Sequence, residues 1–165
     1  MSKAKHQFEE VYQANYPKVV RMCMGYVNGD EDLAKDLAQE VFIKVWEHLP
    51  KFRNESSLST WIYRITVNTC LIQLRIKKRT VSMEQFDVPG EETDERQASR
   101  ENQLKQLYAC IAKLPEESKS IVLLELEGLP QKEIALITGR SYEAVRVRLH
   151  RIKNSLTQCV QDDNI

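Results

Sequence analysis

The sequence predicts an all-α protein of two small helical domains joined by a flexible acidic linker. Apolar residues recur every three or four positions in both halves of the chain, as on one face of a helix, and strand-like alternation is hard to find. Residues 81–103 lose this periodicity, hold seven acidic against two basic side chains and contain Pro89-Gly90. We therefore expect domains at 1–80 and 104–165 around a linker at 81–103.

The apolar spacing defines the helices of the first domain. Phe8 lies in an early helix, and Pro17 marks its boundary or the start of the next one. A longer helix ends at Pro50, and a further helix begins near the caps Ser59 and Thr60. The stripe of the longer helix is formed by Leu33, Leu37, Val41 and Val45, widened by Phe42, Trp46 and Leu49.

The second domain carries the sharpest local signal, which is a helix-turn-helix. One helix stops at Pro115 and the next runs to Gly128. Beyond them, Ala135 allows two helices to approach closely, Gly139 supplies the positive φ of the turn, and Val145 anchors the second helix to the first.

The second helix of this motif has two distinct faces, and Ser141 is placed to cap it. Its buried stripe is predicted to contain Tyr142, Val145, Leu149, Ile152 and Leu156. Its outward faces carry Arg146, Val147, His150 and Arg151. Arginine can grip guanine or phosphate and valine can touch a thymine methyl, so this face predicts major-groove reading; the alternative is a basic, solvated helix in a small bundle.

Composition excludes several classes of function. The formal net charge is zero, no apolar run is long enough to span a bilayer, and we expect a soluble protein of the cytoplasm. The scattered cysteines, Cys23, Cys70, Cys110 and Cys159, favour reduced structural thiols over a disulfide frame or a zinc site. No nucleophile, phosphate loop or metal cluster accompanies the three histidines, so we expect neither an enzyme nor a cofactor.

Two segments together resemble bacterial RNA polymerase sigma factors of the short extracytoplasmic-function type. DLAQEVFIKVWEHLPKFRNESSLSTWIYRITVNTCL, residues 36–71, resembles sigma region two, and LPEESKSIVLLELEGLPQKEIALITGRSYEAVRVRLHRIKNSL, residues 114–156, resembles sigma region four. The second segment departs from the family pattern at Thr138 and Arg140, on either side of the turn glycine. The resemblance implies a subunit that binds core polymerase, recognises the minus-35 and minus-10 promoter elements and helps to melt the promoter.

The resemblance also implies roles for particular residues. A turn after the longer helix would hold a flipped base of the minus-10 element, the next helix would face the upstream edge of the melted DNA, and a basic run would hold phosphates. The turn is Phe52, Arg53, Asn54, Glu55, Ser56 and Ser57; the helix residues are Trp61, Arg64 and Asn68; the basic run is Lys77, Lys78 and Arg79. For Phe52 and Trp61, a position in the core is as well supported as a contact with DNA. Minus-35 contacts would come from Ser141, Arg146, Val147, His150 and Arg151.

Protein partners follow from the same resemblance. The helix before the turn would dock on the clamp helices of the polymerase through Asp36, Gln39, Glu40, Lys44 and Glu47. The second domain would seat on the polymerase flap, and an anti-sigma protein would be a further partner. The alternative is a conventional helix-turn-helix regulator whose N-terminal domain senses a ligand or forms a dimer, but such a regulator would not need the 52–68 segment.

Overall fold

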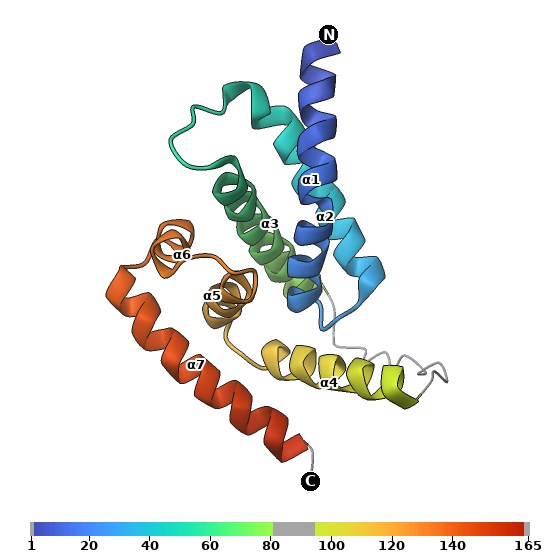
Figure 1. Cartoon of the computed structure of the whole chain (residues 1–165), viewed down its shortest axis with the longest axis vertical. Helices are drawn as coiled ribbons and strands as arrows, with labels where there is room; N and C mark the ends of the chain where they lie inside the picture. Colours follow the sequence, from blue (N-terminus) through green and yellow to red (C-terminus); the bar gives the residue numbers. More distant parts are fainter. Residues whose placement is uncertain (1, 81–94, 164–165) are drawn as a thin grey trace.

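The computed structural model describes residues 2–80 and 95–163, and these ranges form α-helices with one short 3-10 helix and no strand (Figure 1). The all-α prediction is therefore confirmed. The N-terminal half consists of α1 (Ser2–Tyr26), α2 (Glu31–His48), η1 (Leu49–Lys51) and α3 (Leu58–Thr80). The C-terminal half consists of α4 (Glu95–Ala112), α5 (Glu116–Leu126), α6 (Gln131–Thr138) and α7 (Tyr142–Asp163).

Helices α1, α2 and α3 pack around an apolar core that includes Val19, Met22, Val41, Val45 and Ile62. Pro17 lies inside α1, so the predicted boundary at this proline is wrong. Proline lacks the amide that would bond to the carbonyl four residues earlier. That residue, Gln13, is exposed, so water can bond to its carbonyl and the helix continues. Trp46, expected in the buried stripe, is 49% exposed and packs edge-on against Phe8.

Side-chain caps set the starts of α2 and α3. Asp30 caps α2 by accepting a hydrogen bond from the amide of Leu33 at 3.1 Å. Ser57 caps α3 in the same way, because its hydroxyl accepts from the amide of Thr60 at 3.1 Å. The predicted caps, Ser59 and Thr60, lie two and three residues beyond Ser57, inside the helix that Ser57 caps.

The helix-turn-helix has the geometry that its spacing predicts. Ala135 and Val145 are buried, and Gly139 ends α6 with a φ of 71°, where a side chain would be strained. Ser141 caps α7 through the amide of Ala144 at 3.1 Å. Tyr142, expected in the buried stripe, is 43% exposed because it is the first residue of α7 and precedes the packed turns.

The second half begins earlier than its apolar spacing indicates. Helix α4 starts at Glu95, so residues 95–103, which we expected in the linker, lie in a helix. The acidic residues at 81–94 lie outside the described residues.

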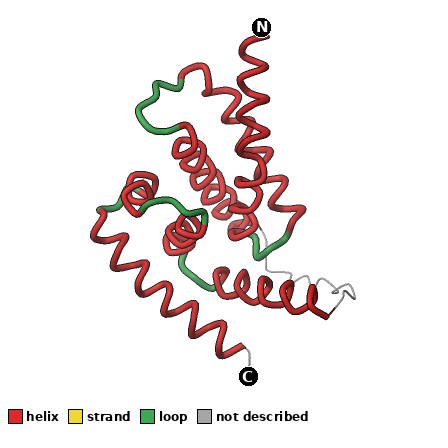
Figure 2. Tube along the Cα trace, viewed as in Figure 1, coloured by secondary structure: helices red, strands yellow, loops and turns green. Residues whose placement is uncertain are grey.

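The two halves of the chain contact each other. Helix α1 contacts α4 and α5, and α3 contacts α5 and α6, so the C-terminal helices cover one side of the N-terminal ones (Figure 2). The figure also shows that the long loop between η1 and α3 lies at the end of α3 that is farther from α4.

We expect Ile134→Ala to destabilise the helix-turn-helix by about 2–5 kcal/mol, because Ile134 is fully buried and its loss leaves a cavity. Leu136→Ala is the matched control on the same helix. Leu136 is 63% exposed, so this change should cost no more than about 0.5 kcal/mol. Urea denaturation followed by circular dichroism measures both, and equal losses would contradict the assignment of the buried face.

Candidate nucleic-acid interface

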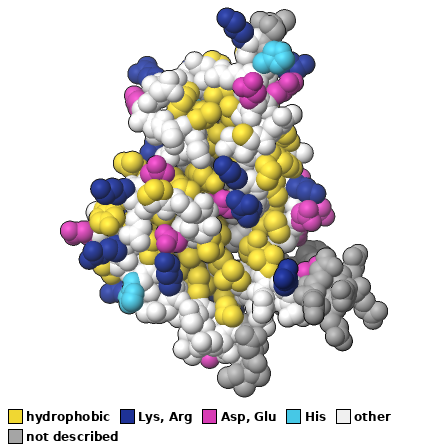
Figure 3. Space-filling model, viewed as in Figure 1, with side chains coloured by type: hydrophobic (Ala, Val, Ile, Leu, Met, Phe, Trp, Pro, Cys, Tyr) yellow, Lys and Arg dark blue, Asp and Glu magenta, His cyan; other side chains and the backbone are white. Residues whose placement is uncertain are grey.

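Helix α7 presents a basic outward face. Arg146, Val147, His150 and Arg151 are exposed, whereas Val145, Leu149, Ile152 and Leu156 form the buried stripe on the other side. Figure 3 shows Lys and Arg side chains along the left edge of the molecule, where α7 runs in Figure 1. Arginines and a small apolar side chain on one helix face fit the dimensions and chemistry of the DNA major groove.

A carboxylate on α5 holds the turn of the helix-turn-helix in place. Glu117 pairs with Arg148 at 2.7 Å and also with Arg140. The Thr138 hydroxyl donates to the carbonyl of Ile134 at 2.7 Å. The two positions that depart from the sigma pattern, Thr138 and Arg140, therefore have bonded partners inside this half of the chain. Arg148 is turned away from the outward face that carries Arg146 and Arg151.

The loop between η1 and α3 contains exposed polar side chains beside two aromatic rings. Arg53, Asn54 and Glu55 are exposed, and Asn54 has a φ of 58°, a conformation that asparagine tolerates better than most residues. The rings of Phe52 and Trp61 have centroids 5.0 Å apart, and both side chains are half-buried. A base could stack on this half-exposed pair while polar side chains reach its edge.

The serines of this loop have local hydrogen bonds. The Ser56 hydroxyl donates to the carbonyl of Ser57 at 3.3 Å. The Ser57 hydroxyl donates to Thr60 Oγ1 at 2.8 Å while it caps α3. Ser57 therefore has a structural duty that its sequence context did not reveal.

The predicted DNA-facing residues of α3 lie against the C-terminal half. Arg64 and Asn68 have exposed side chains, but the Arg64 guanidinium donates to the carbonyl of Leu136 on α6 at 3.2 Å. Asn68 lines a cleft that also contains Thr138 and Arg140. The α3 face that carries these residues is thus partly covered by α6.

The basic run at the end of α3 does not adjoin the loop. Lys77 lines a groove between α2 and α3, at the far end of α3 from residues 52–57. The side chains of Lys78 and Arg79 lie outside the described residues.

The same groove brings together three of the residues predicted to bind polymerase. Asp36, Gln39 and Glu40 line it with Leu33 and Leu37. Of the other two, Lys44 is half-buried and donates to Thr69 on α3 at 3.2 Å, and Glu47 is exposed outside the groove. The lining of the groove combines apolar side chains with acidic, amide and lysine side chains, which suits a polar helix of a partner protein.

A polar cluster between the two halves was not foreseen from the sequence. Both oxygens of Glu127 accept hydrogen bonds from Arg21 at 2.6 Å, and Tyr63 donates to the same carboxylate at 3.1 Å. Burial and the neighbouring Glu127 charge raise the pKa of Tyr63, and the hydrogen bond to Glu127 raises the pKa of Arg21. No local motif marks these residues, because Arg21 and Tyr63 lie 106 and 64 positions from Glu127 in the sequence.

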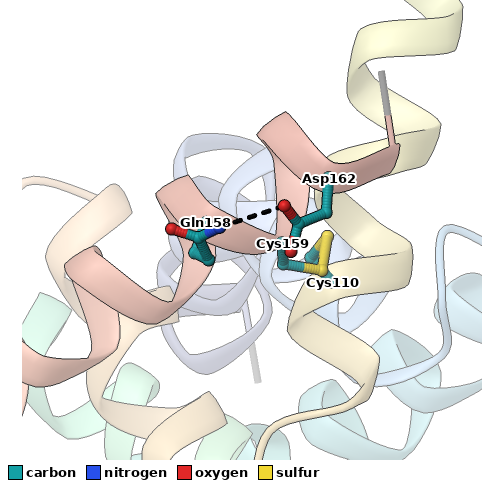
Figure 4. The surroundings of a disulfide bond; sticks show 4 residues. All are labelled: Cys110, Gln158, Cys159 and Asp162. Carbon is teal, nitrogen blue, oxygen red and sulfur yellow. Dashed lines mark hydrogen bonds between the residues drawn. A yellow bond between two sulfur atoms is a disulfide. The ribbon is translucent and has the colours of Figure 1, made fainter. Parts of the chain in front are cut away.

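The cysteines form two pairs. Cys110 on α4 and Cys159 on α7 form a disulfide, with Cα atoms 6.0 Å apart (Figure 4). The expectation of reduced thiols is wrong for this pair, since helix packing joins cysteines that are far apart in sequence. Cys23 and Cys70 are free and buried, with their sulfurs 3.7 Å apart. The hydrogen bond to Cys23 and burial raise the pKa of the Cys70 thiol, which favours its protonated form.

We expect Cys159→Ser to lower the free energy of unfolding of the oxidised protein by about 2–4 kcal/mol, because the disulfide closes a 49-residue separation. Urea denaturation without reductant measures the loss. With excess dithiothreitol the parent should unfold like the variant. A parent that unfolds identically with and without reductant would contradict a stabilising disulfide.

The described residues contain no group of three or more His, Cys, Asp and Glu side chains that could hold a metal ion. Among the helices in these residues, none is both long and apolar enough to cross a bilayer.

Family models match both halves of the chain. The model of Sigma-70 region 2 matches residues 11–80, and the model of Sigma-70 region 4 matches residues 104–156. The chain is 33% identical to the RNA polymerase sigma factor SigZ of Bacillus subtilis over 80% of this chain and 75% of that protein. It is also 33% identical to the ECF RNA polymerase sigma-E factor of Escherichia coli, over 87% of this chain and 81% of that protein.

Two solved structures have a similar fold. The sigma factor RpoE in complex with the anti-sigma factor NepR from Bartonella quintana has a TM-score of 0.75 at 19% identity, covering 94% of this chain and 97% of that one. CnrH in complex with the cytosolic domain of CnrY has a TM-score of 0.73 at 20% identity, covering 98% of this chain and 95% of that one.

Proposed function

The chain belongs to the extracytoplasmic-function sigma factors, and we propose how its residues divide the work of such a factor. Sigma factors are not enzymes; they bind core RNA polymerase and recognise promoters. We assign minus-10 recognition and polymerase docking to a domain at 1–80, and minus-35 recognition to a domain that follows the linker. We further place this work in the cytoplasm, with the polymerase.

The minus-35 reader is the outward face of α7. One observation supports this assignment. On α7, the exposed face with Arg146, Val147 and Arg151 lies opposite the buried stripe of the same helix. A helix held so firmly on one side can present its other side to the major groove with little loss of conformational entropy.

The minus-10 reader is the loop at 52–57 together with the first turns of α3. A flipped base would stack on the Phe52 and Trp61 pair, and Asn54 and Glu55 would reach its exposed edge. Ser57 contributes mainly by holding the start of α3, because its hydroxyl is engaged in the cap.

The groove between α2 and α3 is the surface we assign to the polymerase clamp helices. Asp36, Gln39 and Glu40 gather on its rim, whereas Lys44 is turned toward Thr69 and supports the packing of α2 on α3. The similar structures of RpoE and CnrH hold NepR and CnrY, and an anti-sigma protein is correspondingly the regulator that we propose for this chain.

We expect Arg146→Ala and Arg151→Ala each to weaken use of a minus-35-dependent promoter by about 1–3 kcal/mol if they contact bases. Run-off transcription with core polymerase measures this on a promoter that the holoenzyme selects from a random DNA library. Lys153→Ala is the matched control, because Lys153 lies on the same helix but pairs with Glu125 at 3.1 Å. If both arginine variants transcribe like the parent, the minus-35 assignment is wrong.

Exchanging Asn54, Glu55 and Ser56 for other polar residues, with Ser57 kept as the cap, should change which minus-10 base is preferred. Affinity for core polymerase should stay the same, because the groove at Asp36 and Glu40 is unaltered. Promoter selection with each holoenzyme reads the base preference, and competition against the parent for core polymerase reads the affinity. Loss of polymerase binding with an unaltered base preference would contradict this division.

A further inference from the structure

We propose that Glu117 is a positioning residue for the minus-35 reader. Its carboxylate pairs with Arg140 in the turn and with Arg148 on α7. Through these two ion pairs it sets the orientation of the recognition helix, and with it the base preference of Arg146 and Arg151. The inference rests on the proposed function, because it concerns the contacts that make the outward face of α7 selective.

Four arginines lie in the turn and the first half of α7, and the structure gives them two different environments. Arg146 and Arg151 are exposed on the outward face, and within the described residues neither has an ion-pair partner. Arg140 and Arg148 share the carboxylate of Glu117, and each meets a different oxygen of it. Two arginines are therefore available to bases, and the other two attach the helix-turn-helix to α5.

The two attachments lie at points that define the direction of α7. Arg140 comes just before Ser141, the cap of α7, whereas Arg148 lies nearly two turns into the helix. Arg146 and Val147 lie between the two attachments in the sequence. A helix that is held both at its start and in its second turn resists rotation about its axis and sliding along it.

The buried stripe of α7 fixes this orientation less sharply than the ion pairs do. Val145, Leu149 and Ile152 are buried, but the hydrophobic effect that holds them is non-directional. Charge-assisted bonds depend on direction as well as distance, and Arg148 Nη1 lies 2.7 Å from Glu117 Oε2. Base contacts require their donors to be held within about 0.5 Å and 10–20° of the productive geometry. The ion pairs supply this precision.

Glu117 lies where a carboxylate can keep both partners. It belongs to the first turn of α5, where the helix dipole favours a negative charge. Its side chain is 32% exposed, so salt in the solvent screens its ion pairs less than those of a fully exposed group. All three members of the cluster belong to the C-terminal half. The cluster therefore does not depend on contacts with the N-terminal half.

The alternative is that these ion pairs only add stability to the C-terminal half. Glu117→Gln removes the charge that holds both arginines and keeps the shape of the side chain. Glu125→Gln is the matched control, because Glu125 joins α5 to Lys153 at 3.1 Å, beyond the last residue of the outward face. A charge-swapped variant, Glu117→Arg with Arg140→Glu and Arg148→Glu, restores two ion pairs with inverted signs.

The experiment compares holoenzymes formed from core polymerase and either the parent or one of these variants. Fluorescence anisotropy at about 0.15 M salt gives dissociation constants for the promoter duplex that the parent holoenzyme selects. It also gives them for copies in which the most discriminating base pair of one element is exchanged. The ratio of the two constants is the discrimination at that element. Arginines released by Glu117→Gln would bind phosphates on every duplex alike, so these contacts cancel in the ratio.

We expect Glu117→Gln to lower the minus-35 discrimination about fivefold, out of the roughly 5–150-fold that one exchanged base pair costs. Discrimination at the minus-10 element should keep its parent value, and both ratios should match the parent in Glu125→Gln. The charge-swapped variant should recover much of the minus-35 discrimination, although its added negative charge weakens binding to all DNA.

Unaltered minus-35 discrimination in Glu117→Gln would overturn the positioning role, and so would an equal fall in Glu125→Gln. A fall at both elements, or a Glu117→Gln chain that circular dichroism shows to be unfolded, would assign the ion pairs to stability alone. A folded charge-swapped variant without recovery would also contradict the inference, and if that variant does not fold, the two single variants decide. If the parent holoenzyme itself shows no minus-35 discrimination, the proposed function of α7 is wrong and the inference fails with it.

Discussion

The arrangement of this protein depends on one carboxylate, that of Glu127, and on the two donors that meet it from the other half of the chain. Arg21 and Tyr63 come from α1 and α3, so a single buried acceptor fixes α5 against two helices at once. That placement brings α6 over Arg64 and leaves the outward face of α7 exposed. The fold thus exposes the α7 face that we assign to the minus-35 element and covers part of the α3 face that we assign to the minus-10 element.

Much of the fold could be predicted because its signals are local. The spacing of Ala135, Gly139 and Val145 reports a turn whose geometry depends on those residues alone, and the structure has it. The outward position of Arg146 and Arg151 follows from the period of the helix. Family resemblance added the functional meaning of the 52–68 segment, which neither periodicity nor composition could supply.

The predictions from sequence were wrong where the outcome depends on the tertiary structure. The Cys110–Cys159 disulfide depends on α4 packing against α7, and neither cysteine has a neighbour in sequence that reveals the other. Proline usually ends a helix. Pro17 lies inside α1, and its effect there depends on whether water can reach the carbonyl that it leaves unbonded. Both cases required the tertiary structure: helix packing brings the two cysteines together, and the exposure of Gln13 leaves its carbonyl open to water.

We propose that this chain reads promoters only as a subunit of the polymerase, which positions the two halves that we assign to the two promoter elements. The most direct measurement is a fluorescence-anisotropy titration of a labelled, holoenzyme-selected promoter duplex at about 0.15 M salt, with and without core enzyme. We expect weak binding by the isolated chain, whose formal net charge is zero, and tight, sequence-specific binding with core polymerase present. Sequence-specific binding by the chain alone, as tight as that of the holoenzyme, would contradict it and favour a conventional helix-turn-helix regulator.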